Sequence, residues 1–378
     1  MKHASALLAL CLLALVSVSC SRTAEDANEI VIGEYGSLTD TTATFGISTK
    51  NGIDMAIDAV NQAGGLLGKQ VRVIVEDDQG RPEEAQTVVT KLITRDRVVA
   101  ILGEVASSRT LAAAPVAQQN GIPMISPSST NPRVTEVGDY IFRVCFIDPF
   151  QGFVMAKFAT QTLNVKNVAI LRDIKNDYSV GLADVFVQNM TEMGGTIVAD
   201  QSYSEGDTDF SAQLTSIKSK NPQAIFVPGY YTEVGLIARQ AKNLGLTVPL
   251  LGGDGWDSPR LIDIGGEALN GSYYSNHSSM EDPNPAIQKF VADYRARFNE
   301  TPDALAALGY DSAMILFDAI RRANSTEPAA IRDAIATTRD FEGITGKITM
   351  DENRNPVKPA VVLKVQDGAL QFVETVSP

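Results

Sequence analysis

Short aliphatic runs alternate with segments of helical periodicity along most of this chain of 378 residues. Four runs in its first part are typical of buried parallel strands: residues 30–32, 71–75, 98–102 and 123–125. Apolar residues between the first two runs recur at the spacing of one helix face, at positions 53, 56, 57 and 60. Alternating strands and helices predict repeated βαβ units, and therefore an α/β fold built on a parallel sheet.

The same alternation begins again after Asp148-Pro149 and indicates a second α/β domain. Its predicted strands are residues 168–171, 196–199, 224–227 and 248–251. From Pro285 the pattern is mostly helical, and strands return only at residues 360–365 and 370–373. Because a chain of this length exceeds the usual size of one hydrophobic core, we expect two domains.

Residues 1–19 have the pattern of a secretory signal peptide, in which Lys2 precedes an apolar run and small residues follow it. The run is about 15 residues long, shorter than the roughly 20 that span a bilayer. Val18-Ser19-Cys20 resembles the end of a bacterial lipoprotein signal, so we expect lipidation of Cys20. The same small residues also suit ordinary cleavage without a lipid. In either case we expect a periplasmic or otherwise extracytoplasmic protein.

The chain is acidic, with a formal net charge of −13. Loss of residues 1–19, in which Lys2 is the one full charge, makes the net charge about −14. We therefore expect neither nucleic acid nor an anionic lipid surface as a partner. After the signal the chain has two cysteines, Cys20 and Cys145, which excludes a disulfide framework. Apolar neighbours predict that Cys145 is an inert thiol in the core.

Residues for familiar enzymatic chemistry are scarce. His277 is the one histidine after the signal, which excludes sites of two histidines and histidine-dependent triads, and its polar neighbours predict a solvated loop residue. The stretch GGLLGKQ from Gly64 to Gln70 lacks the glycine register and the hydroxyl of a phosphate loop, and a helix-ending turn explains it better. We predict no metal, no cofactor and no enzymatic activity.

Hydroxyl groups follow two neighbouring strands of the first domain. The segment Gly103 to Ser108 comes after residues 98–102 and precedes a helical run, and Ser126 to Pro132 follows residues 123–125. Ligands of open parallel sheets bind at the carboxyl ends of strands, and the free N–H groups of a helix N-terminus suit a carboxylate. The alternative is that Ser107 or Ser108 merely caps the helix.

A tyrosine and an acid follow two strands of the second domain. Tyr230 comes after residues 225–227, and Asp254 lies between glycines after residues 250–251. A carboxylate and an aromatic face are the partners that an ammonium group prefers. The alternative for Asp254 is a turn residue. Together the strand ends predict a site for a zwitterion in a crevice between two domains.

These segments together resemble the periplasmic leucine/isoleucine/valine-binding proteins of ABC transporters. The resemblance covers nearly all of the chain after the signal, and it implies two doubly wound parallel-sheet lobes joined by a three-segment hinge, the type I periplasmic binding fold. The matching segments are IGEYGSLTDTTATFG from Ile32, AGGLLGKQVRVIVEDDQGRPEEA from Ala63, GEVASS from Gly103, GIPMISPSST from Gly121, PGYYTEVGLIARQAKNLGL from Pro228 and LLGGDGW from Leu250.

The resemblance implies seven ligand-binding positions: Phe45, Ser107, Ser128, Thr130, Tyr178, Tyr230 and Asp254. The three hydroxyl residues of the first lobe would hold the ligand's carboxylate and ammonium, and the closing lobe would add Tyr230 and Asp254. Ser179 follows Tyr178 where the family has glycine, which leaves the shape of that loop open. Ser128 stands where some relatives have alanine and use its backbone. We expect Trp256 to shape the side-chain subsite.

Three crossings between the lobes are also implied, near residues 145–149, 276–278 and 355–359. Lobe 1 would comprise residues 29–148 plus 278–357, and lobe 2 residues 149–277 plus 358–378. Closure of this hinge would bury the ligand. We expect a monomer that takes a small branched-chain or related aliphatic amino acid and delivers it to an inner-membrane ABC permease.

Two alternatives stay open. Relatives with this fold recognise amides, urea or aromatic acids, or serve as sensing domains, and an amide ligand would not need Asp254. An α/β enzyme could use Asp254 and Glu104 as acid and base without histidine.

Overall fold

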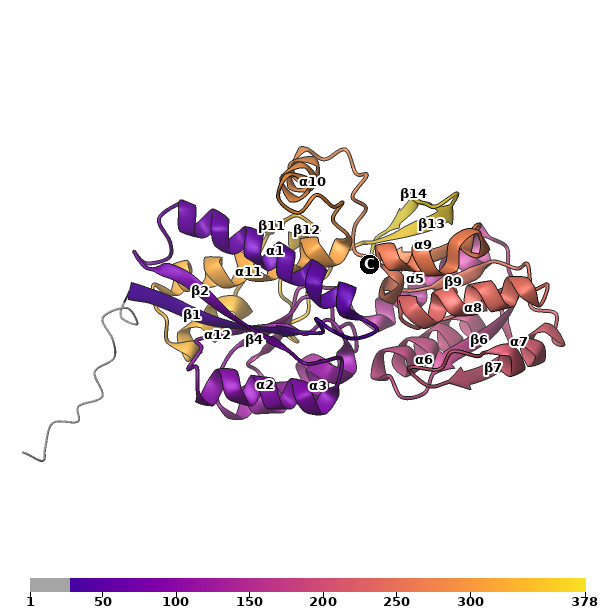
Figure 1. Cartoon of the computed structure of the whole chain (residues 1–378), viewed down its shortest axis with the longest axis horizontal. Coiled ribbons are helices and arrows are strands. Elements are labelled where there is room, and N and C mark those ends of the chain that lie inside the picture. Colours follow the sequence, from indigo (N-terminus) through magenta and orange to yellow (C-terminus); the bar gives the residue numbers. More distant parts are fainter. Residues whose placement is uncertain (1–27) are drawn as a thin grey trace, which may run out of the picture.

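The computed structural model describes residues 28–378, which form two α/β lobes side by side (Figure 1). The predicted signal peptide of residues 1–19 and the predicted lipidation of Cys20 lie outside the described residues. Within the described part, no helix has both the length and the apolar character needed to cross a membrane.

The first lobe contains a sheet of five parallel strands. Its strand order is β2 (Gln70–Asp77), β1 (Glu29–Gly36), β3 (Ile101–Leu102), β4 (Met124–Ser126) and β5 (Ile141–Arg143). One face packs against α1 (Ala43–Gln62) and α11 (Ala304–Ala323), and the other against α2 (Pro82–Thr94) and α3 (Ser107–Gln119). Helices on both faces of a parallel sheet confirm the predicted doubly wound arrangement.

The second lobe contains a mixed sheet of seven strands. Its strand order is β14 (Ala369–Val376), β13 (Ala360–Gln366), β10 (Ser272–Asn276), β9 (Leu250–Gly252), β8 (Ala224–Phe226), β6 (Asn167–Asp173) and β7 (Thr196–Tyr203). The pairs β10–β13 and β13–β14 are antiparallel, so this sheet is parallel only from β10 to β7. Its larger helices are α5 (Asp148–Lys157), α6 (Asp177–Glu192), α7 (Ser211–Lys218), α8 (Tyr231–Asn243) and α9 (Pro259–Gly265).

The chain crosses between the lobes three times, after β5, after β10 and before β13. The elements between the second and third crossings return to the first lobe: α10 (Pro285–Phe298), α11, α12 (Pro328–Ala336) and the hairpin β11 (Phe341–Gly343) and β12 (Gly346–Ile348). A fold of two lobes with a three-segment hinge is therefore confirmed. The individual residue boundaries of the lobes stay predictions.

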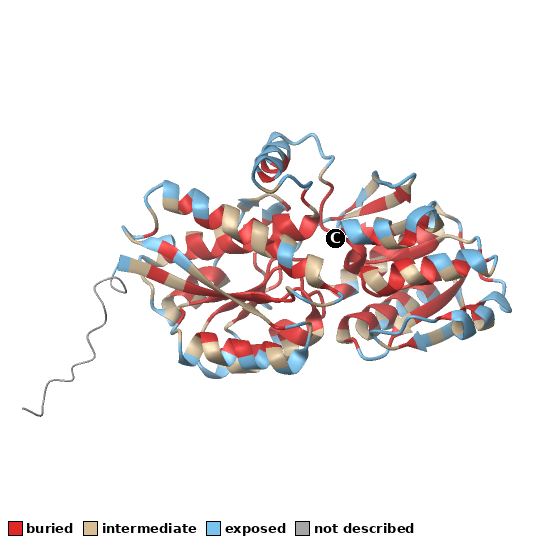
Figure 2. Ribbon diagram, in the orientation of Figure 1, coloured by how far each residue is buried: buried red, intermediate tan, exposed pale blue. Residues whose placement is uncertain are grey.

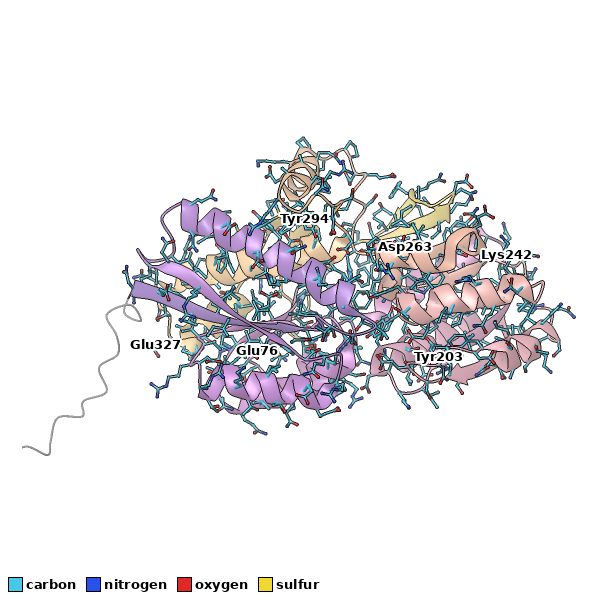
Figure 3. All side chains as sticks on the ribbon, in the orientation of Figure 1. Glu76, Tyr203, Lys242, Asp263, Tyr294 and Glu327 are labelled. Carbon is cyan, nitrogen blue, oxygen red and sulfur yellow. The ribbon has the colours of Figure 1, made fainter. Side chains whose placement is uncertain are left out.

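Burial follows the expected periodicity. The inner helix faces and the central strands of both sheets are buried (red in Figure 2), while the outward helix faces are exposed. Charged side chains such as Lys242, Asp263 and Glu327 project from the surface of both lobes (Figure 3). Cys145 is a buried free thiol whose pKa is raised to about 12 by burial, which confirms the prediction of an inert core residue.

The segment that faintly matches a phosphate loop is a turn. Helix α1 ends at Gln62, and Leu66 and Lys69 exchange two backbone hydrogen bonds of 2.8 Å. Gly65 has a φ of 82°, and a Cβ there would lie 1.9 Å from the carbonyl oxygen of Lys69. Only glycine fits this position, so the predicted helix-ending turn is confirmed.

Candidate ligand site between the lobes

A narrow cavity lies between the lobes, where the carboxyl ends of both sheets face each other. Strand ends of both sheets supply polar or aromatic residues to it, and ligands of open α/β sheets bind in such crevices at the carboxyl ends of the strands. The lining residues are Phe45, Val105, Ser107, Ser128, Tyr178, Tyr230, Asp254, Gly255 and Leu305.

The N-terminus of α3 forms one side of the cavity. Its first residue is Ser107, and the preceding Ala106 makes no side-chain cap. The Ser107 Oγ accepts a 3.2 Å hydrogen bond from the Asn131 amide, and the Ser108 Oγ accepts one of 2.9 Å from the Asp177 amide. Neither serine caps the helix, so the capping alternative is wrong. The first-turn N–H groups and the positive end of the helix dipole suit a carboxylate.

Asp254 forms the opposite side, at the start of a short 3-10 turn after β9. Its Oδ2 accepts a 3.2 Å hydrogen bond from the Ser128 hydroxyl and lies 3.0 Å from His277 Nε2. Its backbone N–H donates to Gln151 Oε1 at 2.8 Å. Oδ1 is buried and has no hydrogen-bond partner among residues 28–378. A buried carboxylate oxygen requires a cation or donor, and an ammonium group supplies both.

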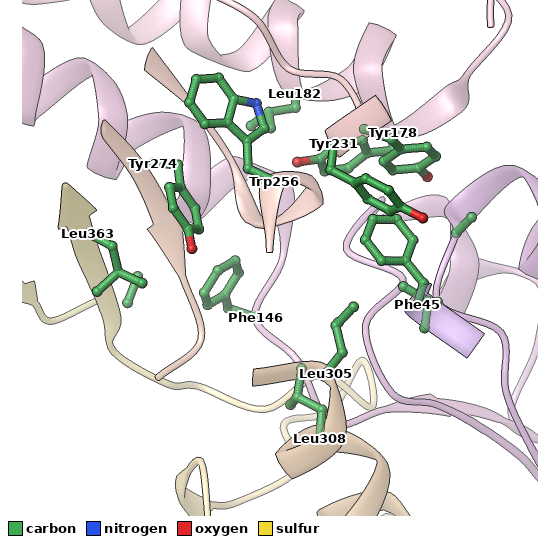
Figure 4. Packing of buried hydrophobic residues seen from close by; sticks show 14 of the residues in the cluster. Phe45, Phe146, Tyr178, Leu182, Tyr231, Trp256, Tyr274, Leu305, Leu308 and Leu363 are labelled. Carbon is green, nitrogen blue, oxygen red and sulfur yellow. The ribbon is translucent and has the colours of Figure 1, made fainter. Parts of the chain in front are cut away.

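Aromatic rings close the cavity from both lobes (Figure 4). Phe45 meets Tyr230 edge to face, with ring centroids 5.3 Å apart, and Tyr230 stacks on Tyr178 at 5.4 Å. Burial raises the pKa of both tyrosines above the usual range, so their hydroxyls stay neutral. The Tyr178 hydroxyl accepts a 3.1 Å hydrogen bond from the Gly255 amide, although Ser179 replaces the family's glycine.

The remaining wall is aliphatic. Val105 precedes α3, and Leu305 lies in the first turn of α11. Together with Phe45 they offer only carbon surface, which favours an apolar ligand side chain. Sequence reasoning did not assign Leu305 to the site, because nothing local distinguishes it from the other apolar residues of its helix.

Six of the seven predicted site residues line the cavity, and Thr130 does not. Thr130 is fully buried, and its carbonyl accepts a 3.0 Å hydrogen bond from the Asp148 amide. Trp256 is not among the residues that line the cavity, and its Nε1 donates to the Val227 carbonyl at 2.9 Å within the second lobe. An influence of Trp256 on the side-chain subsite stays a prediction.

The prediction for His277 is wrong. Its side chain is 0% exposed rather than solvated. It follows β10, whose carboxyl end adjoins the end of β9, and this neighbourhood brings it against Asp254. The polarity of the surrounding sequence misled the prediction, because the neighbouring Ser275 and Asn276 are buried as well, with Ser275 Oγ bonded to Gln151 Oε1 and the Asn276 side chain to the His277 amide.

Glu104 does not act on the cavity. It points into the first lobe, where its carboxylate accepts from the Ser37 amide at 3.2 Å and lies 3.4 Å from Arg109 Nε. Burial raises the pKa of Glu104 to about 8, although the positive charge of Arg109 acts in the opposite direction. The acid and base of the enzyme alternative, Asp254 and Glu104, are therefore not assembled around one reaction space.

The lobes are closed on the cavity. Asn131 Nδ2 donates to the Asp177 carbonyl at 2.9 Å, beside the bond between Ser108 and the Asp177 amide, and Arg133 pairs with the Asp177 carboxylate at 3.0 Å. We call these contacts the Asp177 clasp. They join lobe 1 to the start of α6, one residue before Tyr178, and so hold that tyrosine at the cavity.

Comparisons with known proteins agree with this geometry. Residues 29–369 match the model of a family described as periplasmic binding protein. The Leu/Ile/Val-binding protein BraC3 of Rhizobium johnstonii is 33% identical over 327 residues, 86% of this chain and 88% of that protein. The structure of leucine binding protein LivK from Thermotoga maritima matches with a TM-score of 0.89 and 42% identity, over 92% of this chain and 99% of that one. The structure of the branched-chain amino acid transporter substrate binding protein LivJ from Streptococcus pneumoniae, in complex with isoleucine, matches with a TM-score of 0.88 and 36% identity. The match covers 93% of this chain and 100% of that one.

Proposed function

Because this chain belongs to the periplasmic binding protein family, we propose that it captures a small aliphatic amino acid between its lobes for an ABC transporter. The family consists of solute-binding proteins of transporters, so the chain is a binding protein rather than an enzyme and works outside the cytoplasm. Relatives named for leucine, isoleucine and valine support the choice of ligand class.

The open oxygen of Asp254 carries this proposal. Oδ2 is occupied by Ser128 and His277, while Oδ1 is buried at the cavity without a partner among the described residues. A ligand ammonium would satisfy that oxygen and balance its charge. Urea, amides and aromatic acids carry no such cation, so they would leave a buried carboxylate uncompensated.

The cavity also offers suitable contacts for the ligand's α-carboxylate and for its aliphatic side chain. The first-turn amides of α3 and Ser107 would receive the α-carboxylate. The aliphatic side chain would lie against Phe45, Val105 and Leu305.

Isothermal titration calorimetry tests the proposal with L-leucine, L-isoleucine, L-valine and 4-methyl-2-oxopentanoate, the leucine analogue without an ammonium group. We expect binding of the amino acids and none of the oxo acid. Asp254→Asn should weaken leucine binding at least about tenfold, since a charged hydrogen bond contributes on the order of 1.5–3 kcal/mol. Asp263→Asn, on the surface of the same lobe, is the matched control. Unchanged affinity in Asp254→Asn would remove the ammonium assignment.

We further propose that the chain is a monomer anchored by a lipid on Cys20. The support for the lipid is the signal-like segment that ends in Val18-Ser19-Cys20. Mass spectrometry of the membrane fraction should show a diacylated mature protein. Cys20→Ala should release the protein from the membrane, and a soluble unaltered protein would contradict the anchor.

A further inference from the structure

His277 joins three parts of the molecule that meet behind the ligand site. It lies in the second crossing between the lobes, directly after β10. Its Nε2 is 3.0 Å from Asp254 Oδ2 in the second lobe and 3.1 Å from Ser128 Oγ in the first. Its ring lies over that of Phe146, in the first crossing, with ring centroids 3.9 Å apart and planes tilted by 32°.

The surrounding atoms specify where the histidine proton lies. Asp254 Oδ2 can only accept when the carboxyl is ionised, and it already receives the Ser128 hydroxyl at 3.2 Å. Nε2 must therefore donate to Oδ2. Nδ1 is buried without a partner among the described residues, so a second proton would create a buried N–H without an acceptor. The geometry thus favours a neutral imidazole that carries its proton on Nε2.

A neutral histidine has a consequence for Asp254. It donates a hydrogen bond to the carboxylate but leaves the negative charge in place, whereas a lysine or an arginine would neutralise that charge. The bond occupies Oδ2 and leaves Oδ1 open at the cavity. The negative charge is then available to a ligand ammonium.

We propose that His277 is the positioning residue of the ammonium site, which holds Asp254 by a neutral Nε2–H donor and ties its orientation to the crossings between the lobes. The inference rests on the proposed function, because it assumes that Asp254 receives an ammonium. Asp254 Oδ2 has two side-chain donors, His277 and Ser128, and Ser128 belongs to the first lobe. The carboxylate that would bind the ligand's ammonium therefore also joins the two lobes.

Two substitutions separate the donor from the ring. His277→Gln retains an amide N–H at about the same distance along the side chain, whereas His277→Leu retains bulk without a donor. We expect leucine affinity within about threefold of the unaltered protein for Gln and at least about tenfold weaker for Leu. Thermal unfolding without ligand is recorded for both as the folding control. Equal losses in the two folded variants, or full affinity in the Leu variant, would overturn the proposal.

Nuclear magnetic resonance of the unaltered protein provides a test that needs no variant. The chain has only two histidines, and His3 belongs to the predicted signal, so a tag-free mature protein shows a single imidazole. With ¹⁵N-histidine labelling at pH 7.5 we expect the neutral Nε2–H tautomer with and without leucine, and slower exchange of that proton when leucine is bound. An imidazolium or an Nδ1–H tautomer in the leucine-bound protein would overturn the proposal.

The same measurements distinguish this inference from the proposed function. If the unaltered protein fails to bind leucine, isoleucine and valine, the proposed function fails, whatever the tautomer. If it binds them and the Gln variant is as weak as the Leu variant, the function stands and the positioning role of His277 fails.

Discussion

The hydroxyl of Ser128 in the first lobe donates a 3.2 Å hydrogen bond to Oδ2 of Asp254 in the second lobe. The two residues are 126 positions apart in the sequence. Each partner lies on a different lobe, so the bond directly joins the two lobes at the cavity. It gives the Ser128 side chain a role that the family resemblance left open.

We expect Ser128→Ala to weaken leucine binding by about 1 kcal/mol, roughly fivefold, because one neutral donor to the buried carboxylate is lost while His277 remains. Calorimetric titration measures the change. Ser219→Ala, on the surface of the second lobe, is the control and should bind as the unaltered protein does. An unchanged affinity in Ser128→Ala would mean that the backbone alone matters at this position.

The Asp177 clasp should govern how fast the ligand leaves. Ser108→Ala and Asn131→Ala each remove a bond to the Asp177 backbone that closes the lobes, so each should accelerate leucine dissociation about fivefold. Arg133→Ala is the internal control. The Arg133 side chain is 65% exposed and that of its ion-pair partner Asp177 is 40% exposed, so this pair should contribute little to lobe closure. Stopped-flow fluorescence measures the release rates. A larger effect from Arg133→Ala than from the other two variants would contradict this ranking.

Gly255 should tolerate no side chain. A Cβ there would lie 2.9 Å from the Gly229 carbonyl oxygen, 2.9 Å from a Tyr230 ring carbon and 3.0 Å from a Tyr178 ring carbon. Gly255→Ala must therefore displace the stacked tyrosines into the cavity, and we expect leucine binding to fall by more than about tenfold. Gly36→Ala, whose Cβ would meet only ordinary contact at 3.5 Å, is the matched control. Calorimetry and thermal unfolding of both variants decide whether the loss is specific to binding.

Glu34 should make the protein less stable as pH rises. Burial, assisted by Asp54, raises the pKa of Glu34 from 4.5 to about 8. Between these two values the folded state holds a proton that the unfolded state has released, so the free energy of unfolding falls as pH increases from about 4.5 to 8. Each pKa unit corresponds to about 1.4 kcal/mol, so the total is on the order of a few kcal/mol.

Glu34→Gln should therefore lose less stability across this pH range than the unaltered protein. Urea unfolding at pH 5 and pH 8.5 measures the difference. Glu83→Gln, an exposed glutamate at the start of α2, should keep the original pH dependence. Parallel curves for Glu34→Gln and the unaltered protein would show that Glu34 does not titrate in this range.

Strands with a strong aliphatic pattern were predictable, and polar ones were not. The runs in β1, β2, β6 and β7 were identified because each strand contains a short continuous run of aliphatic residues, which is typical of parallel strands. Strand β10, Ser-Tyr-Tyr-Ser-Asn, was missed because its polar side chains are satisfied by tertiary hydrogen bonds, such as that from Ser275 Oγ to Gln151 Oε1 at 3.0 Å. The strand β5, Ile-Phe-Arg, was missed because the buried Arg143 interrupts its apolar run.

The sequence by itself determined the α/β class, the two-lobed arrangement and the chemistry at the strand ends, since the period of apolar residues and the residues after each strand are local properties. The tertiary structure decided which of those groups meet. It brought His277 and Leu305 to the site, left Thr130 out of the cavity lining and paired Ser128 with Asp254. The physical reason is that these contacts depend on how two lobes, connected by three crossings, close on each other. No spacing along the chain encodes that closure, which is set by the packing of both lobes together.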